Sequence, residues 1–265
     1  ALSLKNTLNL NKNKFIYISS YLKSNMEHSY DSDWGNDIFW SQEPYNVEGW
    51  SYEYYQKELR KRTMFTQELR HIYKWHANEP LGYKIASGFY YKKLKENDDA
   101  IGWILGGEDA GLDSEFNISN LAYYNEIKLN LKKLFITFNL RIEKIDIDYK
   151  SIHFHEYYDY FTYNTTYDTS YVDTENNNNL KGGKFSLLYE LNEKNNIYIT
   201  LSNGFKSGGI NQNPRLSLDN RTYKPEYNEN IDIGFRFRNN ISSLNFTTFY
   251  MKRNDLQVSL SSQQD

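Results

Sequence analysis

The sequence contains no cysteine, only four prolines, and no apolar run near the roughly 20 residues that a membrane-spanning helix needs. Without cysteine, the chain can form no disulfide, no thiolate nucleophile and no cysteine-ligated metal site. It also lacks an excess of one charge, since 31 Lys and Arg stand against 34 Asp and Glu. Nucleic-acid-binding proteins usually carry a basic excess, so no nucleic-acid partner is expected.

Aromatic residues, in contrast, are abundant: 25 Tyr, 15 Phe and 5 Trp make up 17% of the 265 residues. Aromatic side chains favour β-strands and gather on surfaces that are apolar on one side and wet on the other. The mean hydropathy of −0.81 is that of a soluble protein. This average does not exclude a membrane β-barrel, because only alternate residues of its strands face lipid.

Apolar and polar residues alternate in several segments, which is the pattern of a β-strand with one apolar face. In the segment 134–142, for example, every even position is Leu, Ile or Phe. The same alternation occurs in the segments 2–10, 121–131, 185–191, 197–201 and 231–237. The segments 121–131 and 134–146 reach the ~9–11 residues with which a tilted strand crosses a bilayer.

Short and long connections alternate along the chain. Tight turns are expected at residues 11–13, 78–80, 132–133, 192–195 and 239–242. Long irregular loops are expected at about 27–62, 95–119, 150–182 and 206–226. In an up-and-down sheet this order places all tight turns at one end, as in outer-membrane barrels. The pattern predicts ten strands in five hairpins, without a domain boundary.

Several oppositely charged pairs fall on the face opposite the apolar rows. These pairs are Glu68 with Arg70, Glu126 with Lys128, Arg141 with Glu143, and Asp232 with Arg236. A charge facing lipid at mid-membrane costs about 2–4 kcal/mol for Arg or Lys. We therefore expect these pairs to line a hydrated interior.

Three consecutive motifs carry a family resemblance. The segment NGFKSGGINQNP follows an alternating strand, and YKPEYNENIDIGFRF and LNFTTFYMKRNDLQV come after it. In this order they resemble TonB-dependent receptors of the Gram-negative outer membrane, over nearly the whole chain and most clearly from 184 to 258. The resemblance implies an all-β, membrane-spanning, antiparallel up-and-down barrel with short periplasmic turns and long extracellular loops. Residues 1–265 would be a fragment supplying about ten of roughly 22 strands, with the plug domain and the C-terminal strands outside it.

The resemblance also implies a function. The intact protein would be a multi-pass outer-membrane receptor for active uptake of a scarce nutrient, most often a ferric siderophore. Its partners would be outer-membrane lipid, its own plug domain, the TonB complex and the small-molecule cargo, with no cofactor. Two alternatives remain open: a soluble or surface β-rich carbohydrate-binding protein, and an outer-membrane barrel enzyme using His153, His155 and Asp159. Because no nucleophile elbow or phosphate loop occurs, no enzyme activity is predicted.

Candidate site residues fall into three groups. The motif residues are expected to shape the barrel rim, with direct ligand contact as the alternative: Gly204, Phe205, Lys206, Ser207, Gly208, Gly209, Tyr223, Pro225 and Glu226. The glycines among them suit a strand end that bends away with positive φ. Loop residues that could contact an amphipathic ligand are Trp34, Trp40, Trp50, Tyr157, Tyr158, Tyr160, Tyr163 and Asn211. No metal site is predicted, and His153 and His155, in a segment expected to be a mobile loop, come nearest to one.

Overall fold

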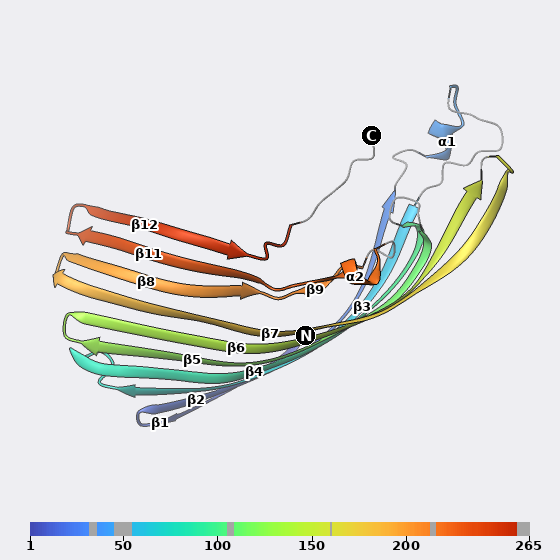
Figure 1. Ribbon diagram of the computed structural model, residues 1–265. Helices are drawn as coiled ribbons and strands as arrows, with labels where there is room; N and C mark the ends of the chain where they lie inside the picture. The colour runs from blue at the N-terminus through green and yellow to red at the C-terminus, as the bar shows by residue number, and fades with distance from the viewer. Residues whose placement is uncertain (32–35, 45–54, 105–108, 160, 213–215, 259–265) are drawn as a thin grey trace.

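The computed structural model describes residues 1–31, 36–44, 55–104, 109–159, 161–212 and 216–258. Ten strands form one antiparallel sheet in which neighbours follow the chain order (Figure 1). They are β1 (Leu2–Leu10), β2 (Asn13–Asp31), β3 (Tyr55–Trp75), β4 (Leu81–Ile104), β5 (Asp109–Leu131), β6 (Leu134–Asp159), β7 (Asn164–Asn192), β8 (Asn195–Lys206), β11 (Glu226–Arg238) and β12 (Ser243–Asn254). The helix α1 (Asp37–Trp40) lies between β2 and β3, and β9 (Gly209–Ile210), α2 (Leu218–Arg221) and β10 (Thr222–Tyr223) lie between β8 and β11.

The ten predicted strands and their five hairpins are confirmed. The tight connections lie together at one side of the sheet, on the left of Figure 1. The sheet is open, with β1 and β12 at its edges, so it forms a curved wall rather than a closed barrel. Neither helix in the described part of the chain is long enough to cross a membrane, since each has four residues.

The predicted long loops are largely wrong, because the strands continue through them. β4 runs to Ile104 and pairs with β5 from Asp109, inside the expected loop 95–119. β6 and β7 pair without a break up to Asp159 and Asn164, inside the expected loop 150–182. In these segments the outward side chains are largely polar, and several inward ones, such as Asp98 and His153, are polar although they are buried. The polar composition of these segments therefore marks an extension of the sheet and not a loop.

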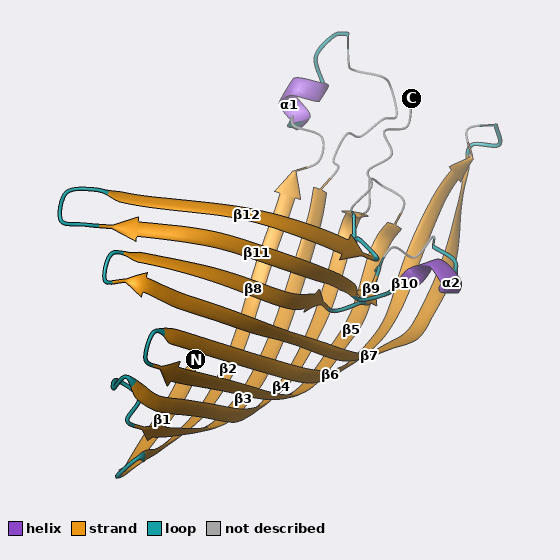
Figure 2. Ribbon diagram, turned by 60° about the vertical axis from the view of Figure 1, so that its left-hand side comes forward, coloured by secondary structure: helices purple, strands orange, loops and turns teal. Residues whose placement is uncertain are grey.

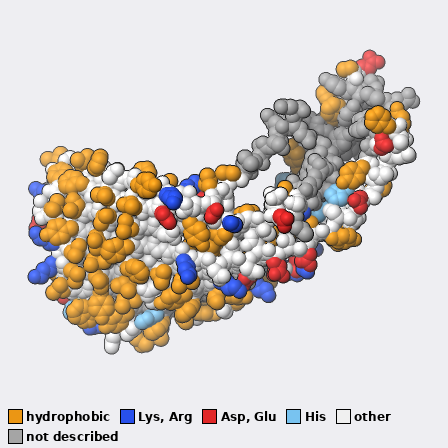
Figure 3. Space-filling model, in the orientation of Figure 1, with side chains coloured by type: hydrophobic (Ala, Val, Ile, Leu, Met, Phe, Trp, Pro, Cys, Tyr) orange, Lys and Arg blue, Asp and Glu red, His pale blue; other side chains and the backbone are white. Residues whose placement is uncertain are grey.

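One face of the sheet, here called the outer face, carries an apolar band beside the tight connections. Each of the ten strands contributes a large apolar side chain that is at least 38% exposed: Leu8, Phe15, Leu69, Phe89, Leu121, Phe138, Phe185, Leu201, Ile233 and Phe246. The register places these residues at the same parity in neighbouring strands, as the alternation predicted. Figure 3 shows hydrophobic side chains crowded over this part of the molecule, on its left.

The opposite, inner face carries a buried apolar cluster farther from the tight connections. Its members are Ile145, Ile147, Tyr149, Val172, Leu180 and Ile210. Five of them come from β6 and β7, whereas Ile210 comes from β9 in the connection between β8 and β11. Tyr149 and Leu180 are completely buried. Burial of this cluster explains why β6 and β7 stay regular so far beyond the apolar band.

The connection between β8 and β11 is therefore long because it folds back onto the sheet. The Asn176 side-chain amide donates hydrogen bonds to the carbonyl oxygens of Gly209, at 2.7 Å, and Tyr223, at 3.2 Å. Figure 2 shows this connection, in which β9 contacts β6 and β7 and is followed by α2 and β10. A two-residue turn could join β8 to β11, but it could not carry Ile210 to the inner face.

Candidate functional site

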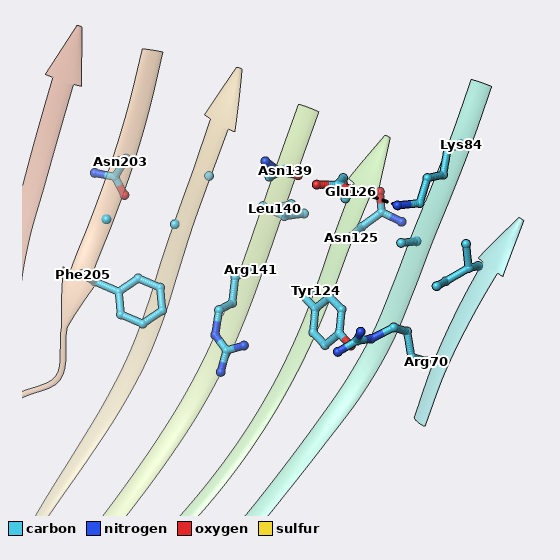
Figure 4. Close-up of a pocket in the computed structure, with 15 residues that line it drawn as sticks. Arg70, Lys84, Tyr124, Asn125, Glu126, Asn139, Leu140, Arg141, Asn203 and Phe205 are labelled. Carbon is cyan, nitrogen blue, oxygen red and sulfur yellow. Dashed lines mark hydrogen bonds and ion pairs between the residues drawn. The ribbon is translucent and has the colours of Figure 1, made fainter. Parts of the chain in front are cut away.

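A hollow of about 700 Å³ lies on the inner face, behind the apolar band. Figure 4 shows the side chains of Arg70, Tyr124, Arg141 and Phe205 around it, contributed by β3, β5, β6 and β8. Gly182 on β7 leaves room for the Phe205 ring, since a Cβ there would lie 3.0 Å from two of its ring carbons. The hollow therefore combines cationic groups with an aromatic wall.

Three of the four predicted charge pairs are formed on this face. An Arg70 guanidinium nitrogen lies 2.6 Å from Glu68, and Arg70 also donates to the Tyr124 hydroxyl at 2.9 Å. The other two pairs join Arg141 with Glu143 at 2.5 Å and Lys128 with Glu126 at 3.3 Å.

The two members of the fourth pair lie on the inner face as predicted, but they do not contact each other. Asp232 accepts a hydrogen bond from Asn230, and Arg236 lies over the Tyr198 ring, 4.4 Å from its centroid. Four residues correspond to about 13 Å along a strand, which is too far for an ion pair, so Arg236 finds its partner on the neighbouring strand.

A second charged network lies on the inner face beyond the band. The Arg60 guanidinium donates two hydrogen bonds to Asp98, at 2.7 and 2.8 Å, and lies 2.6 Å from Glu58. Arg62 binds Glu96 beside it. The hydrogen bond to Asp98 raises the pKa of Arg60 above its ordinary value. Asp98 and Glu96 are each 8% exposed, so these two carboxylates are fixed in place and mostly shielded from water.

The histidines lie in a regular strand, and the mobile loop predicted around them is wrong. His153 and His155 are on β6, with 0% and 6% of their surface exposed. Their ring centroids are 6.3 Å apart, and Tyr157 continues the stack at 6.0 Å from His155. Their Nε2 atoms are 2.9 Å from the Ser151 hydroxyl and 2.8 Å from the Ser170 hydroxyl. Within the described residues, no group of three or more acidic or histidine side chains could hold a metal ion.

The motif residues meet where β8, β11 and β12 end. Glu226 accepts a hydrogen bond from Arg253 at 2.7 Å and another from the Gln257 backbone N–H at 3.0 Å. The Gln257 side-chain amide donates to the carbonyl oxygens of Ser207 and Lys224, each at 2.9 Å. These bonds join three strand ends that are far apart in the sequence.

The family follows from a comparison over the whole chain. A family model described as TonB dependent receptor-like, beta-barrel, matches residues 2–265. The chain belongs to this family. None of the curated proteins matches the sequence.

Solved structures resemble this receptor barrel in fold. The ferric yersiniabactin uptake receptor FyuA from Yersinia pestis aligns with a TM-score of 0.68 and 17% identity, over 97% of this chain and 36% of that one. The ferric-catecholate import receptor Fiu from E. coli K12, in its closed form, gives 0.64 and 14%, over 92% and 38%. The siderophore receptor PiuA from Acinetobacter baumannii gives 0.61 and 12%, over 94% and 38%. At such identities the likeness concerns the fold, and this chain spans little more than a third of each receptor.

The motif glycines act in the receptor barrel through close contact rather than positive φ. Among the described residues, the glycine with positive φ is Gly102. A Cβ on Gly208 would lie 2.3 Å from the Tyr223 carbonyl oxygen, and one on Gly209 would lie 2.2 Å from the Tyr223 hydroxyl. A Cβ on Gly204 would meet nothing within 4 Å. The positive φ expected for these glycines is therefore wrong, and two of them allow β9 to pack against β10.

The remaining motif residues have ordinary positions. Lys206 ends β8 opposite Glu226, the first residue of β11, and Pro225 directly precedes that strand. Tyr223 on β10 pairs with Gly209 on β9. These residues shape one corner of the wall.

The loop candidates that the structure describes lie on different elements. Trp34, Trp50 and Tyr160 lie outside the described residues, as does the side chain of Tyr158. Tyr157 faces the inner side in line with His155, whereas Tyr163 is 78% exposed in the turn between β6 and β7. Trp40 stacks edge-on with Phe39 in α1, and the Asn211 backbone N–H donates to the Arg221 carbonyl at 2.7 Å.

The sequence analysis missed the network around Arg60. The sequence did contain a pattern that indicates this network. Glu58, Arg60 and Arg62 are alternate residues and so face one side of a strand, and Glu96 and Asp98 do the same on the next strand. Both segments had been interpreted as loops, and parity has no meaning in a loop.

The motif corner leads to a prediction about pH. The hydrogen bond from the Gln257 N–H, followed by that from Arg253, holds the pKa of Glu226 below its ordinary value of 4.5. A lowered pKa stabilises the fold above pH 4.5, and this contribution disappears as the pH falls toward the folded value. We expect Glu226→Gln to lower the urea midpoint at pH 7, and the difference from wild type to shrink below pH 4.5.

The matched control is Glu229→Gln on the same strand, whose side chain is exposed. It should change the urea midpoint little at either pH. A difference for Glu226→Gln that stays constant between pH 7 and pH 3 would contradict the role of its charge.

Proposed function

We propose that the intact protein is an outer-membrane uptake receptor and that residues 1–265 form part of its barrel wall. One observation carries the proposal: a ten-strand apolar band on the outer face lies back to back with charged pairs on the inner face. Lipid outside and water inside are the two solvents that this arrangement fits. The family match supports the same placement.

A soluble carbohydrate-binding protein fits this wall poorly. Soluble monomers rarely expose contiguous apolar patches larger than a few hundred Å². Here the band crosses every one of the ten strands, with side chains such as Leu8, Phe89 and Phe246 more than half exposed. A second apolar layer or a lipid bilayer must cover such a surface, and the described chain provides no second layer.

The cargo that we propose is a ferric siderophore. FyuA, Fiu and PiuA are named as receptors for ferric siderophores or for siderophores, and they share the fold of this wall. The charged inner wall around Arg60 and Arg70 would face the plug domain and the passing cargo. Energy would come from the TonB complex acting on a plug outside residues 1–265.

An uptake assay tests this function. Deletion of the gene in its host should abolish accumulation of iron-55 supplied as the host's own ferric siderophore under iron limitation. Re-expression of the intact receptor should restore accumulation, and removal of TonB should abolish it again. Unchanged iron uptake together with lost uptake of cobalamin, haem or an oligosaccharide would assign a different cargo. Unchanged uptake of every nutrient would refute the transport proposal.

A barrel enzyme receives no support from the geometry. The Asp159 carboxylate accepts hydrogen bonds from the Phe161 N–H, at 2.8 Å, and the Thr162 hydroxyl, at 2.7 Å. It thereby closes the turn after β6, four residues beyond His155, which corresponds to about 13 Å along a strand. Asp159 is thus too far away to orient either histidine as a base.

A further inference from the structure

A groove of about 580 Å³ opens on the outer face at the upper margin of the apolar band, on the side away from the tight connections. Gly183 on β7 is paired in register with Leu140 on β6 and with Asn203 on β8. Because Gly183 has no side chain, a recess remains between these two neighbours. Phe138, Phe185 and Leu201 occupy the next row toward the tight connections and form its apolar floor. Lys181 stands at the opposite end, two residues beyond Gly183.

The groove belongs to the band, and the strand segments at Gly182 and Gly183 separate it from the inner hollow, whose lining shares these two glycines. Its floor residues are 38–43% exposed, and Ile231 on β11 extends the apolar surface at 42%. A Cβ on Gly183 would lie 2.9 Å from the Asn139 carbonyl oxygen, so a larger residue at this position would require a shift of the backbone. An acyl chain would enter from the outer face, where Phe138, Phe185 and Leu201 are exposed.

Lys181 belongs to a row of lysines that follows the margin of the band. Counted along each strand from the tight connection, the apolar band ends at an apolar residue or glycine. On five strands the next residue that faces outward is an exposed lysine: Lys23, Lys93, Lys144, Lys181 and Lys252. On β3, β5 and β8 the equivalent residues are Thr63, Ser119 and Asn203, and on β11 it is Glu229, which also lines the groove. A row of cations beside an apolar surface complements the anionic headgroups of a lipid leaflet.

We propose that the groove at Gly183 binds an acyl chain of an anionic membrane lipid whose phosphate contacts Lys181. The proposal rests on the proposed location of the barrel in a membrane. The apolar floor takes up the chain, as the rest of the band takes up ordinary lipid. The recess and Lys181 together distinguish this position, since the recess holds one chain in a fixed place beneath the cation.

Fluorescence quenching by brominated lipids tests the proposal. The intact receptor is labelled with a small fluorophore at Leu201→Cys, on the groove floor, and reconstituted with brominated phosphatidylglycerol or brominated phosphatidylethanolamine. The matched control is Ile127→Cys, which lies in the same row of the band through Phe138 and Phe185. The chain has no cysteine of its own to compete for the label.

We expect the Leu201 label to prefer the anionic lipid about fivefold, because one lysine near a membrane surface contributes roughly that factor. The Ile127 label should show no preference. Lys181→Ala should abolish the preference at Leu201, whereas Lys93→Ala, at another point of the lysine row, should preserve it.

The outcomes separate the two proposals. Equal quenching by both lipids at Leu201, or a preference that survives Lys181→Ala, would refute the groove site and leave the membrane barrel intact. Absence of quenching at both labels would show that the band does not face lipid, and it would refute the proposed function itself.

Discussion

Phe138→Arg is expected to destabilise the membrane-inserted barrel more than any other single substitution on its outer face. Phe138 lies on β6 in the middle of the apolar band and is 43% exposed. An arginine facing lipid near the bilayer midplane costs about 2–4 kcal/mol in a transmembrane barrel. Urea titration of the intact receptor in lipid vesicles should show a loss of that size in the free energy of unfolding.

The matched control is Asn139→Arg, one residue along the same strand. Asn139 faces the inner side and is paired in register with Glu126, an acceptor for the new cation. This variant should lose well under half as much stability as Phe138→Arg. If Phe138→Arg were as harmless as an ordinary surface substitution, within about 0.5 kcal/mol, the outer face would be in contact with water.

Leu180→Ala should have the second large effect. Leu180 is completely buried in the inner-face cluster beside Ile145 and Tyr149. Truncating a buried leucine costs about 2–5 kcal/mol through lost burial and the cavity that remains. The same urea titration measures this loss, and hydrogen exchange of residues 208–223 should accelerate because Ile210 packs on the cluster.

Leu191→Ala provides the control on the same strand. Leu191 is 45% exposed near the tight turn after β7, so its truncation creates no cavity. Its effect on unfolding should be much smaller, and exchange in residues 208–223 should not change. Equal losses for the two variants would show that the cluster does not support the extended hairpin or the connection that packs on it.

The outer half of the fold could be predicted from the sequence. In residues 134–142 the even positions form one apolar row, and the strand and its outward face follow directly from that period. The charge pairs Glu68–Arg70 and Arg141–Glu143 followed from the same parity, because both members of a pair lie two residues apart on one strand.

The segments beyond the band could not be predicted in this way. Residues 150–182 contain runs of Asn, Asp, Thr and Tyr. When a strand is recognised by an apolar row on one face, a segment of this composition is interpreted as a loop. Beyond the band no apolar row marks the outward face, and the inner face buries polar residues such as His153 and His155 through cross-strand packing, so polarity does not mark the strand. The histidines, Asp98 and Glu96 were assigned to loops for this reason.

The sequence by itself determined the strand count, the positions of the tight turns and the face that is apolar, because each depends on residues close together in the chain. Only the tertiary structure decided the partners across strands: Arg60 with Asp98, Arg236 with Tyr198, and Glu226 with Arg253 and Gln257. It alone brought Ile210 back to Leu180 and opened the groove at Gly183. Register sets these contacts, and register is a relation between strands that no single segment contains.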